Sequence, residues 1–218
     1  MATLNTTNIK HASSSSNNIV IAADGSTTIS GNATISGNAT ISGNATCSGT
    51  ATGFGGGKVL KIENFIYKDI SSAQSSSNAY MATGLVCSIT PSAANSKIYV
   101  VYNLIIGMAD GFRTGAAVYR DINSGGFSQL TTIKANASGS NQRLSSIGNG
   151  ATLWTPQTLS NCFIDTPSYS VGNAISYKLY TWAESNGTVY VNRIGGHDTT
   201  SNSYGVGCST MTLMEISA

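Results

Sequence analysis

The stretch Ile29-Ser-Gly-Asn-Ala-Thr34, Ile35-Ser-Gly-Asn-Ala-Thr40, Ile41-Ser-Gly-Asn-Ala-Thr46 and Cys47-Ser-Gly-Thr-Ala-Thr52 is one hexad written four times. Within each hexad, Ile or Cys, Gly and Ala alternate with Ser, Asn or Thr, so hydrophobicity has a period of two residues. Successive side chains of an extended chain point to opposite faces. The repeat therefore predicts a β-strand with one small apolar face, because a helix would scatter these residues around its circumference.

The apolar face of the repeat needs neighbours. A lone strand of 24 residues cannot build a core of its own, and repeats bury their faces against adjacent units. We expect copies of the chain to wrap around a common axis as an intertwined fibre shaft, with Ile29, Ile35, Ile41 and Cys47 facing inward. Three chains are the usual closed arrangement, although the repeat does not count chains. The alternative is a flexible linker, which has no reason to hold an apolar residue at every sixth position.

The sequence on either side of the repeat predicts three parts. Ile19, Val20 and Ile21 form a short apolar run between a Ser/Asn cluster and the turn pair Asp24-Gly25. This run is too short to fold alone, so we expect it to anchor the chain to another protein. Gly53-Phe-Gly-Gly-Gly57 gives the backbone freedom to change direction. The predicted organisation is an attachment segment at 1–28, a shaft and hinge at 29–57, and a head at 58–218.

The head shows recurring strand signals and almost no helical periodicity. Turns separate about eight strands, which predicts an all-β fold of the β-sandwich or jelly-roll type. Asn186-Gly187 predicts a two-residue hairpin turn. The residues that mark the strands are Leu85, Cys87 and Ile89; Ile98, Val100, Tyr102, Leu104 and Ile106; Leu159 to Ile164; Ile175, Tyr177, Leu179, Thr181 and Ala183; Val189 and Val191; and Thr212, Met214 and Ile216.

Composition excludes several classes of protein. Only 9% of the 218 residues are charged, against roughly 25% in a typical domain. A net charge of +2 with 40% hydrophobic residues does not fit a disordered tail, and the dispersed cations do not form a nucleic-acid-binding face. No run approaches the ~18 apolar residues of a membrane span, so we expect no membrane insertion.

The N-terminal sequence indicates where the protein is made, and the spacing of the cysteines indicates whether they bind a metal. Met1 to Lys10 is polar and lacks the apolar segment of a secretory signal, so we expect synthesis in a reducing cytoplasm and use outside it. The four cysteines form no C-x-x-C pair, and neither His11 nor His197 lies at ligand spacing from them. We therefore expect free, mostly buried thiols, no metal and no cofactor.

Three segments carry a resemblance to a known family. The opening Met1-Ala-Thr-Leu-Asn-Thr-Thr-Asn-Ile-Lys-His-Ala-Ser-Ser-Ser-Ser-Asn-Asn-Ile-Val20 resembles the N-terminus of tail fibre proteins of marine tailed bacteriophages. Ser88-Ile-Thr-Pro-Ser-Ala-Ala-Asn-Ser-Lys-Ile98 and Ser209-Thr-Met-Thr-Leu-Met-Glu-Ile216 resemble their sandwich-type tips. The resemblance implies a homotrimer located in the virion, attached through its N-terminus to tail or capsid proteins. The distal head would contact the host cell.

Catalysis has weak support in the sequence. A tailspike that cleaves polysaccharide would need two carboxylates at the scissile bond, but Asp110 and Asp198 lie in turn-like contexts where Asp is common. His197-Asp198 beside Gly195-Gly196 is the best polar cluster, and no motif positions a nucleophile near it. We expect no enzymatic activity. A tailspike and a purely structural capsid or tail decoration remain as alternatives.

Binding has better support. Aromatic residues of the head lie among Asn, Ser and Thr, which suits glycans because aromatic rings stack on sugars and amides bond their hydroxyls. Trp154 and Tyr204 lie in loop-like contexts. Together with His197 and Asp198, they are the candidate residues for a host glycan or outer-membrane protein. The loops at 110–114, 138–155 and 195–204 are the regions where we expect the site.

Overall fold

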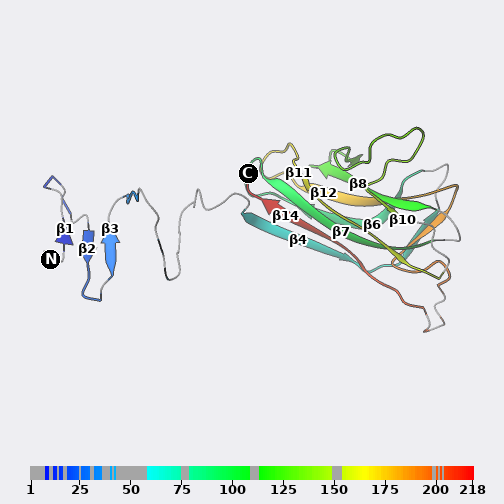
Figure 1. Ribbon diagram of the computed structural model, residues 1–218, viewed down its shortest axis with the longest axis horizontal. Helices are drawn as coiled ribbons and strands as arrows, with labels where there is room; N and C mark the ends of the chain where they lie inside the picture. The colour runs from blue at the N-terminus through cyan, green and yellow to red at the C-terminus, as the bar shows by residue number, and fades with distance from the viewer. Residues whose placement is uncertain are drawn as a thin grey trace. The chain divides into compact units, whose positions relative to one another are not determined.

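The computed structural model describes residues 8–9, 12–13, 15–16, 19–24, 26–29, 32–35, 40, 42, 58–74, 79–108, 113–148, 154–197, 200, 202 and 204–218. The chain divides into two compact units, Met1–Thr52 and Gly53–Ala218 (Figure 1). The regular elements of the described residues are all strands, which confirms the all-β prediction. None of these residues forms a helix long and apolar enough to cross a membrane.

The N-terminal unit contains a small antiparallel sheet in the order β1 (Asn8–Ile9), β2 (Ile19–Ile21) and β3 (Thr27–Ile29). The apolar run Ile19-Val-Ile21 is its middle strand, and Ile19 pairs with Ile29. The first position of the repeat therefore belongs to this sheet. The turn before β3 is closed by Asp24, whose carboxylate accepts a 2.9 Å hydrogen bond from the Ser26 N–H.

The predicted shaft residues are only partly described. In the single chain, Ile29 and Ile35 are 47% and 64% exposed, and residues 32–35 form no strand. Ile41 and Cys47 lie outside the described residues. The inward-facing shaft is therefore a prediction about the assembled protein.

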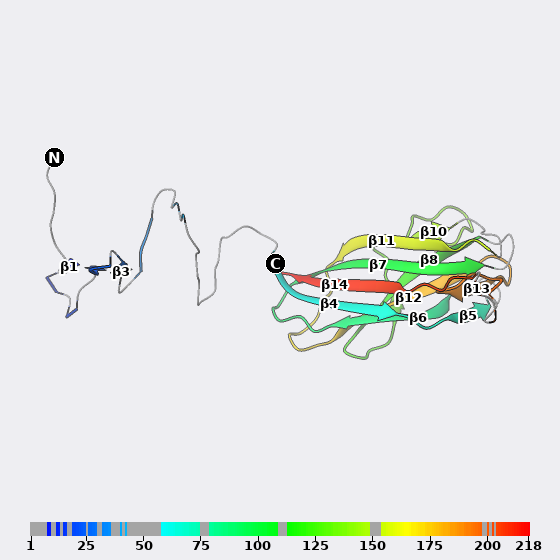
Figure 2. The ribbon, with the colours of Figure 1, turned by 90° about the horizontal axis from the view of Figure 1, so that it is seen from below.

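The head is built from two antiparallel sheets (Figure 2). The five-stranded sheet has the order β10 (Ser146–Gly148), β8 (Thr114–Ile122), β12 (Ile175–Ala183) and β6 (Met81–Ile89), with β9 (Ser128–Gln129) beside β8. The six-stranded sheet has the order β4 (Val59–Tyr67), β14 (Ser209–Ile216), β7 (Lys97–Met108), β13 (Thr188–Val191) and β5 (Ser71–Gln74), with β11 (Gln157–Asp165) on the other side of β7.

The core lies between the two sheets, and alternation along the long strands fills it. In β7 and β12 every second residue is buried, as the period of two predicts. The largest fully buried side chains come from both sheets: Tyr102, Tyr177, Leu85, Ile89, Ile98, Leu104, Ile106, Met108, Ile175, Leu179, Met211 and Leu213.

The hairpin predicted at Asn186-Gly187 is wrong. β12 belongs to the five-stranded sheet and β13 to the six-stranded sheet, so the turn carries the chain from one layer to the other. The tight turn itself is present. Ser185 and Asn186 have positive φ values of 48° and 62°, and the Gly187 N–H donates to the Glu184 carbonyl at 2.9 Å.

The head has two distinct ends. At one end, which we call the base, the Ser217 N–H donates to the Lys58 carbonyl at 2.9 Å, and β7 begins at Lys97. β7 runs to the opposite end, the tip, where Ile106 pairs with Gln157 and Val191. The segments that precede β11 and follow β13 therefore lie at the tip.

Candidate functional site

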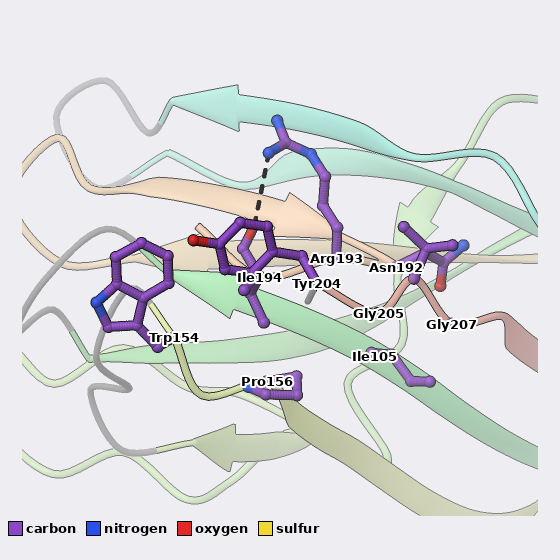
Figure 3. A pocket seen from close by; sticks show the side chains of 10 residues that line it. Ile105, Trp154, Pro156, Asn192, Arg193, Ile194, Tyr204, Gly205 and Gly207 are labelled. Carbon is purple, nitrogen blue, oxygen red and sulfur yellow. Dashed lines mark hydrogen bonds between the residues drawn. The ribbon is translucent and has the colours of Figure 1, made fainter. Parts of the chain in front are cut away.

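Two aromatic residues predicted from separate loops meet at the tip. The rings of Trp154 and Tyr204 are stacked, with centroids 5.4 Å apart and planes at 20° (Figure 3). Trp154 is 56% exposed, and its ring also packs on Gly196, where any side chain would collide with it. The two residues line one cavity of about 460 Å³, together with Ile105, Pro156, Asn192, Arg193, Ile194, Gly205, Val206 and Gly207.

The Asn192 side chain fixes the wall of this cavity. Asn192 is fully buried at φ 61°, a left-handed conformation that Asn tolerates better than most residues. Its Nδ2 donates to the carbonyls of Tyr67 and Asp69 at 2.8 and 2.9 Å, and its Oδ1 accepts from Ser209 Oγ at 2.6 Å. The amide is thus satisfied on both sides and holds three segments of the six-stranded sheet together.

The Asn192 backbone is hydrogen-bonded to Ile105 and to Gly207, and the segments around Arg193 and Val206 form the rim of the cavity. Its N–H donates to the Ile105 carbonyl at 2.9 Å, and its carbonyl accepts from the Gly207 N–H at 2.8 Å. Immediately beyond, Arg193 and Val206 form an antiparallel bridge. These bonds hold the segment that leads from Tyr204 against the one that carries Arg193.

Arg193 brings a positive charge to the rim. Its guanidinium carbon lies 4.3 Å from the centroid of the Tyr190 ring, a cation–π distance, and its Nη1 donates to the Ile194 carbonyl at 3.5 Å (Figure 3). A guanidinium carries five N–H donors, and the bond to Ile194 uses one of them, so the side chain is able to donate to a ligand as well. Arg193 could not be predicted from the sequence, because its position depends on the bridge to Val206 and no local motif indicates that bridge.

The other predicted binding residues are not part of this cavity. His197 is half-buried and does not line it. Its Nδ1 is buried without a hydrogen-bond partner in the described part of the chain. Asp198 lies outside the described residues, as do 110–112, 149–153, 199, 201 and 203 of the predicted loops.

A second cavity of about 720 Å³ opens over the five-stranded sheet. Its lining includes Trp182 and the ion pair of Arg113 with Glu184, whose Nη1 and Oε1 are 3.3 Å apart. The Trp182 Nε1 is buried and has no hydrogen-bond partner among the described residues. We choose the smaller cavity as the candidate site because it alone brings together two aromatic residues that the sequence identified.

Carboxylates of the head have structural partners. Asp165 is buried and accepts hydrogen bonds of 2.7 Å from Arg120 Nη1 and from the Tyr177 hydroxyl. Burial, and then the negative charge of Asp165, raise the pKa of Tyr177 far above its usual value, so this hydroxyl stays a donor. Further carboxylates with partners are Glu215 with Ser92, Ala93 and Ser96, Asp121 with Gly126, and Glu63 with Lys61. Each of these four carboxylates therefore contacts a neighbouring group of the head.

The cysteines differ from the prediction in their exposure. Cys87, Cys162 and Cys208 are free thiols, but only Cys87 is buried. Burial, and then the charge of Glu63, raise the pKa of Cys87 to about 11, so its thiol is unreactive at neutral pH. No group of three or more His, Cys, Asp or Glu side chains in the described ranges is arranged to hold a metal ion.

Comparisons with known proteins return only distant structural likenesses. No family model matches the chain, and no curated protein matches it. Among solved structures, a mutant VP2 protein of infectious bursal disease virus in derived T=1 particles is 14% identical, with 72% of this chain and 36% of that chain covered and a TM-score of 0.37. A chain of the Gt strain of that virus is 13% identical, with 93% and 47% covered and a TM-score of 0.39. The chain thus spans less than half of these proteins, and likenesses this weak carry no argument about function.

Proposed function

We propose that this chain is a bacteriophage virion fibre protein, a homotrimeric tail fibre whose head binds a glycan on the host cell surface. The fibre part of the proposal rests on the hexad repeat and on the resemblance of the N-terminal and head segments to phage tail fibres. The binding part rests on one observation, the stacked Trp154–Tyr204 pair over an open cavity at the tip.

The chemistry of this cavity suits a sugar. The C–H face of a sugar ring packs on aromatic surface, while its hydroxyls need donors and acceptors. Trp154 offers an exposed ring, and Arg193 offers N–H donors at the rim. Arg193 follows the buried Asn192, whose hydrogen bonds fix the backbone of this segment, so little conformational entropy of that backbone is lost on binding. A volume of about 460 Å³ accommodates one or two sugar units, because ligand sites typically measure ~300–1,000 Å³.

Intrinsic fluorescence gives the first test. The chain contains two tryptophans, so Trp182→Phe leaves Trp154 as the sole reporter. We expect this variant to change its emission when titrated with the surface polysaccharide of a bacterial strain that the full-length protein adsorbs to, found by screening a panel of marine strains. Trp154→Ala should weaken adsorption roughly thirtyfold, the effect of losing a ~2 kcal/mol hot-spot residue.

The control for this test is Val171→Ala. Val171 is 58% exposed and lies between β11 and β12 at the base, so its truncation should leave adsorption unchanged. Equal adsorption of the wild type and Trp154→Ala would contradict the proposed site. Release of oligosaccharide from the polysaccharide would identify a tailspike instead, and adsorption to none of the strains would favour a purely structural fibre.

A further inference from the structure

The outer face of the six-stranded sheet carries an ordered set of side chains. The register places Ile164, Tyr99, Met214 and Ile62 in one row across β11, β7, β14 and β4. The next two rows toward the tip are Cys162, Val101, Thr212 and Asn64, then Ser160, Asn103, Thr210 and Ile66. The alternate residues of β7 and β14, among them Tyr102, Leu213 and Met211, fill the core, so these three rows point away from it.

Seven of the twelve side chains in these three rows are apolar or aromatic, and none is a Lys, Arg, Asp or Glu. Of the three rows, the one nearest the base is apolar or aromatic throughout. The adjoining row, closer still to the base, is Lys97, Ile216 and Val59, so a positive charge lies at the margin of the face. Ile62, Ile164 and Ile66 are 58%, 56% and 48% exposed. Antiparallel sheets that face water normally alternate apolar residues inside with polar residues outside. β4 and β7 break this pattern, which predicts that the outer face is covered in the assembled protein.

The other sheet shows how a covered face looks in this molecule. Thr114 to Val118 of β8 are all buried, so both sides of that strand are shielded. The segment between β9 and β10 provides this cover. Its Leu144 packs on Gly115, and its Arg143 carbonyl accepts a 3.2 Å hydrogen bond from the Tyr80 hydroxyl. The outer face of the six-stranded sheet has no such cover from the described residues of the head.

The size of the face limits how strongly it binds. Strands lie about 4.8 Å apart and alternate residues about 6.8 Å apart, so three rows of four side chains span roughly 400 Å². This is about half of the ~800 Å² that each partner contributes to a typical stable interface. The face is therefore sufficient only between copies that another contact already holds together.

The repeat supplies that other contact under the proposed function. β4 begins at Val59, directly after the repeat and the Gly-rich segment, and its Ile62 belongs to the row nearest the base. Copies joined through the repeat would hold their heads at a high effective concentration, which compensates for a small contact area. The three central rows carry no charge, and Lys97 lies only at their margin, which suits association with identical copies because like charges would otherwise meet across the interface.

From these observations we propose that the outer face of the six-stranded sheet, centred on Ile62, Tyr99, Cys162 and Ile164, packs against other copies of this chain. The proposal rests on the trimeric fibre of the proposed function. Around a three-fold axis, three such faces line a common interior. This arrangement leaves the five-stranded sheets outside and the stacked Trp154–Tyr204 pair at the free tip.

Cys162 provides a direct probe, because its thiol lies in the middle row and is exposed in the single chain. We would treat the full-length protein with N-ethylmaleimide and follow each cysteine by peptide mass spectrometry. Cys162 should react about tenfold or more slowly in the wild type than in Ile62→Asp/Ile66→Asp, because interface cores exclude water and charge at the face opposes packing. Ile147→Asp is the matched control, since Ile147 is 79% exposed on β10 of the other sheet and should leave the rate unchanged.

Two further measurements on the same samples show whether the head is folded and whether the protein is a trimer. Cys87 is buried and becomes reactive only if a variant unfolds, so its protection shows that the head is intact. Light scattering on the same samples gives the mass. A wild-type trimer in which Cys162 reacts as fast as it does in a free peptide of residues 158–166 would overturn the interface and leave the fibre proposal intact. A monomeric wild type would overturn the trimer itself.

Discussion

Glu215 is a fully buried carboxylate, and in the described part of the chain its charge is compensated by hydrogen bonds and not by an ion pair. It accepts bonds of 2.8–3.0 Å from the Ser92 and Ala93 N–H groups and from the Ser92 and Ser96 hydroxyls. Burial would raise its pKa, but these bonds outweigh burial and hold the pKa below the usual value. They also join the segments 88–98 and 209–216, which are far apart in the sequence.

This residue makes the stability of the head depend on pH. Because the pKa of Glu215 is lower in the folded state, its contribution is full above about pH 4.5 and is lost as the pH falls through the folded value. Glu215→Gln should lower the free energy of unfolding at pH 7 by about 2 kcal/mol. It should also flatten the loss of stability between about pH 5 and 3.

Urea denaturation of both proteins across this pH range measures the difference. The control is Glu63→Gln, which removes a half-exposed carboxylate paired with Lys61 at 3.1 Å and should cost little. An identical pH dependence of the wild type and Glu215→Gln would contradict the assignment.

At the scale of single elements, β6 is shaped by one glycine. Gly84 has φ 87°, and the register between β6 and β12 shifts at this point. The Thr83 hydroxyl supports the irregularity by donating to the Leu179 carbonyl at 2.9 Å and accepting from the Leu85 N–H at 3.2 Å. The ring of Tyr67 occupies the space where a Cβ would lie, 2.6 Å away, so β4 and β6 approach closely only because this residue is glycine.

Gly84→Ala should therefore cost more than an ordinary glycine replacement. We expect a loss of about 3 kcal/mol in the free energy of unfolding, from backbone strain and from overlap with Tyr67. Gly172→Ala separates backbone strain from steric overlap, because Gly172 has φ 95° but no atom within 4 Å of its Cβ position. This variant should lower the free energy of unfolding by about 1 kcal/mol, from backbone strain alone. Equal losses in the two variants, measured by urea denaturation, would show that the contact with Tyr67 is unimportant.

The strands that could be predicted from the sequence are those with one face buried in the core and the other exposed to solvent. β7 and β12 alternate between core and surface, so their period is visible in the residues. β8 was missed because cover on both faces removes the alternation from Thr114 to Val118. The hairpin at Asn186-Gly187 was predicted wrongly because a turn motif reports local backbone geometry and not which sheet the next strand joins.

Only part of the candidate site was predicted, because the sequence shows local patterns and not contacts between distant segments. Trp154 and Tyr204 stand out locally as large aromatics among turn residues, whereas their stacking joins two segments that lie about 50 residues apart in the chain. Thr212, Met214 and Ile216 were recognised as one face of a strand, but the sequence did not reveal that this face points outward. Contacts between segments far apart in the chain leave no periodic trace.

At the scale of the whole molecule, assembly is predicted to depend on the repeat. Full-length protein should have a mass of about 67 kDa by light scattering, three times the 22.4 kDa of one chain. Ile35→Asn with Ile41→Asn should reduce this to 22.4 kDa, because amides at inward positions would have to be buried unpaired. Deletion of one hexad should leave the trimer intact, since it preserves the alternation. A trimeric double variant would refute the inward-facing shaft.

The hydrogen bond between Ser217 and Lys58 has a consequence for how such proteins diversify. Because Lys58 and Ser217 are hydrogen-bonded to each other at the base, the head can be inserted as a block at a single surface site of another protein. Under the proposed function, the loops of the tip can vary under selection by new hosts while this joint stays the same. The head would then be a transplantable cassette, and we expect changes around Trp154, Arg193 and Tyr204 to redirect its specificity.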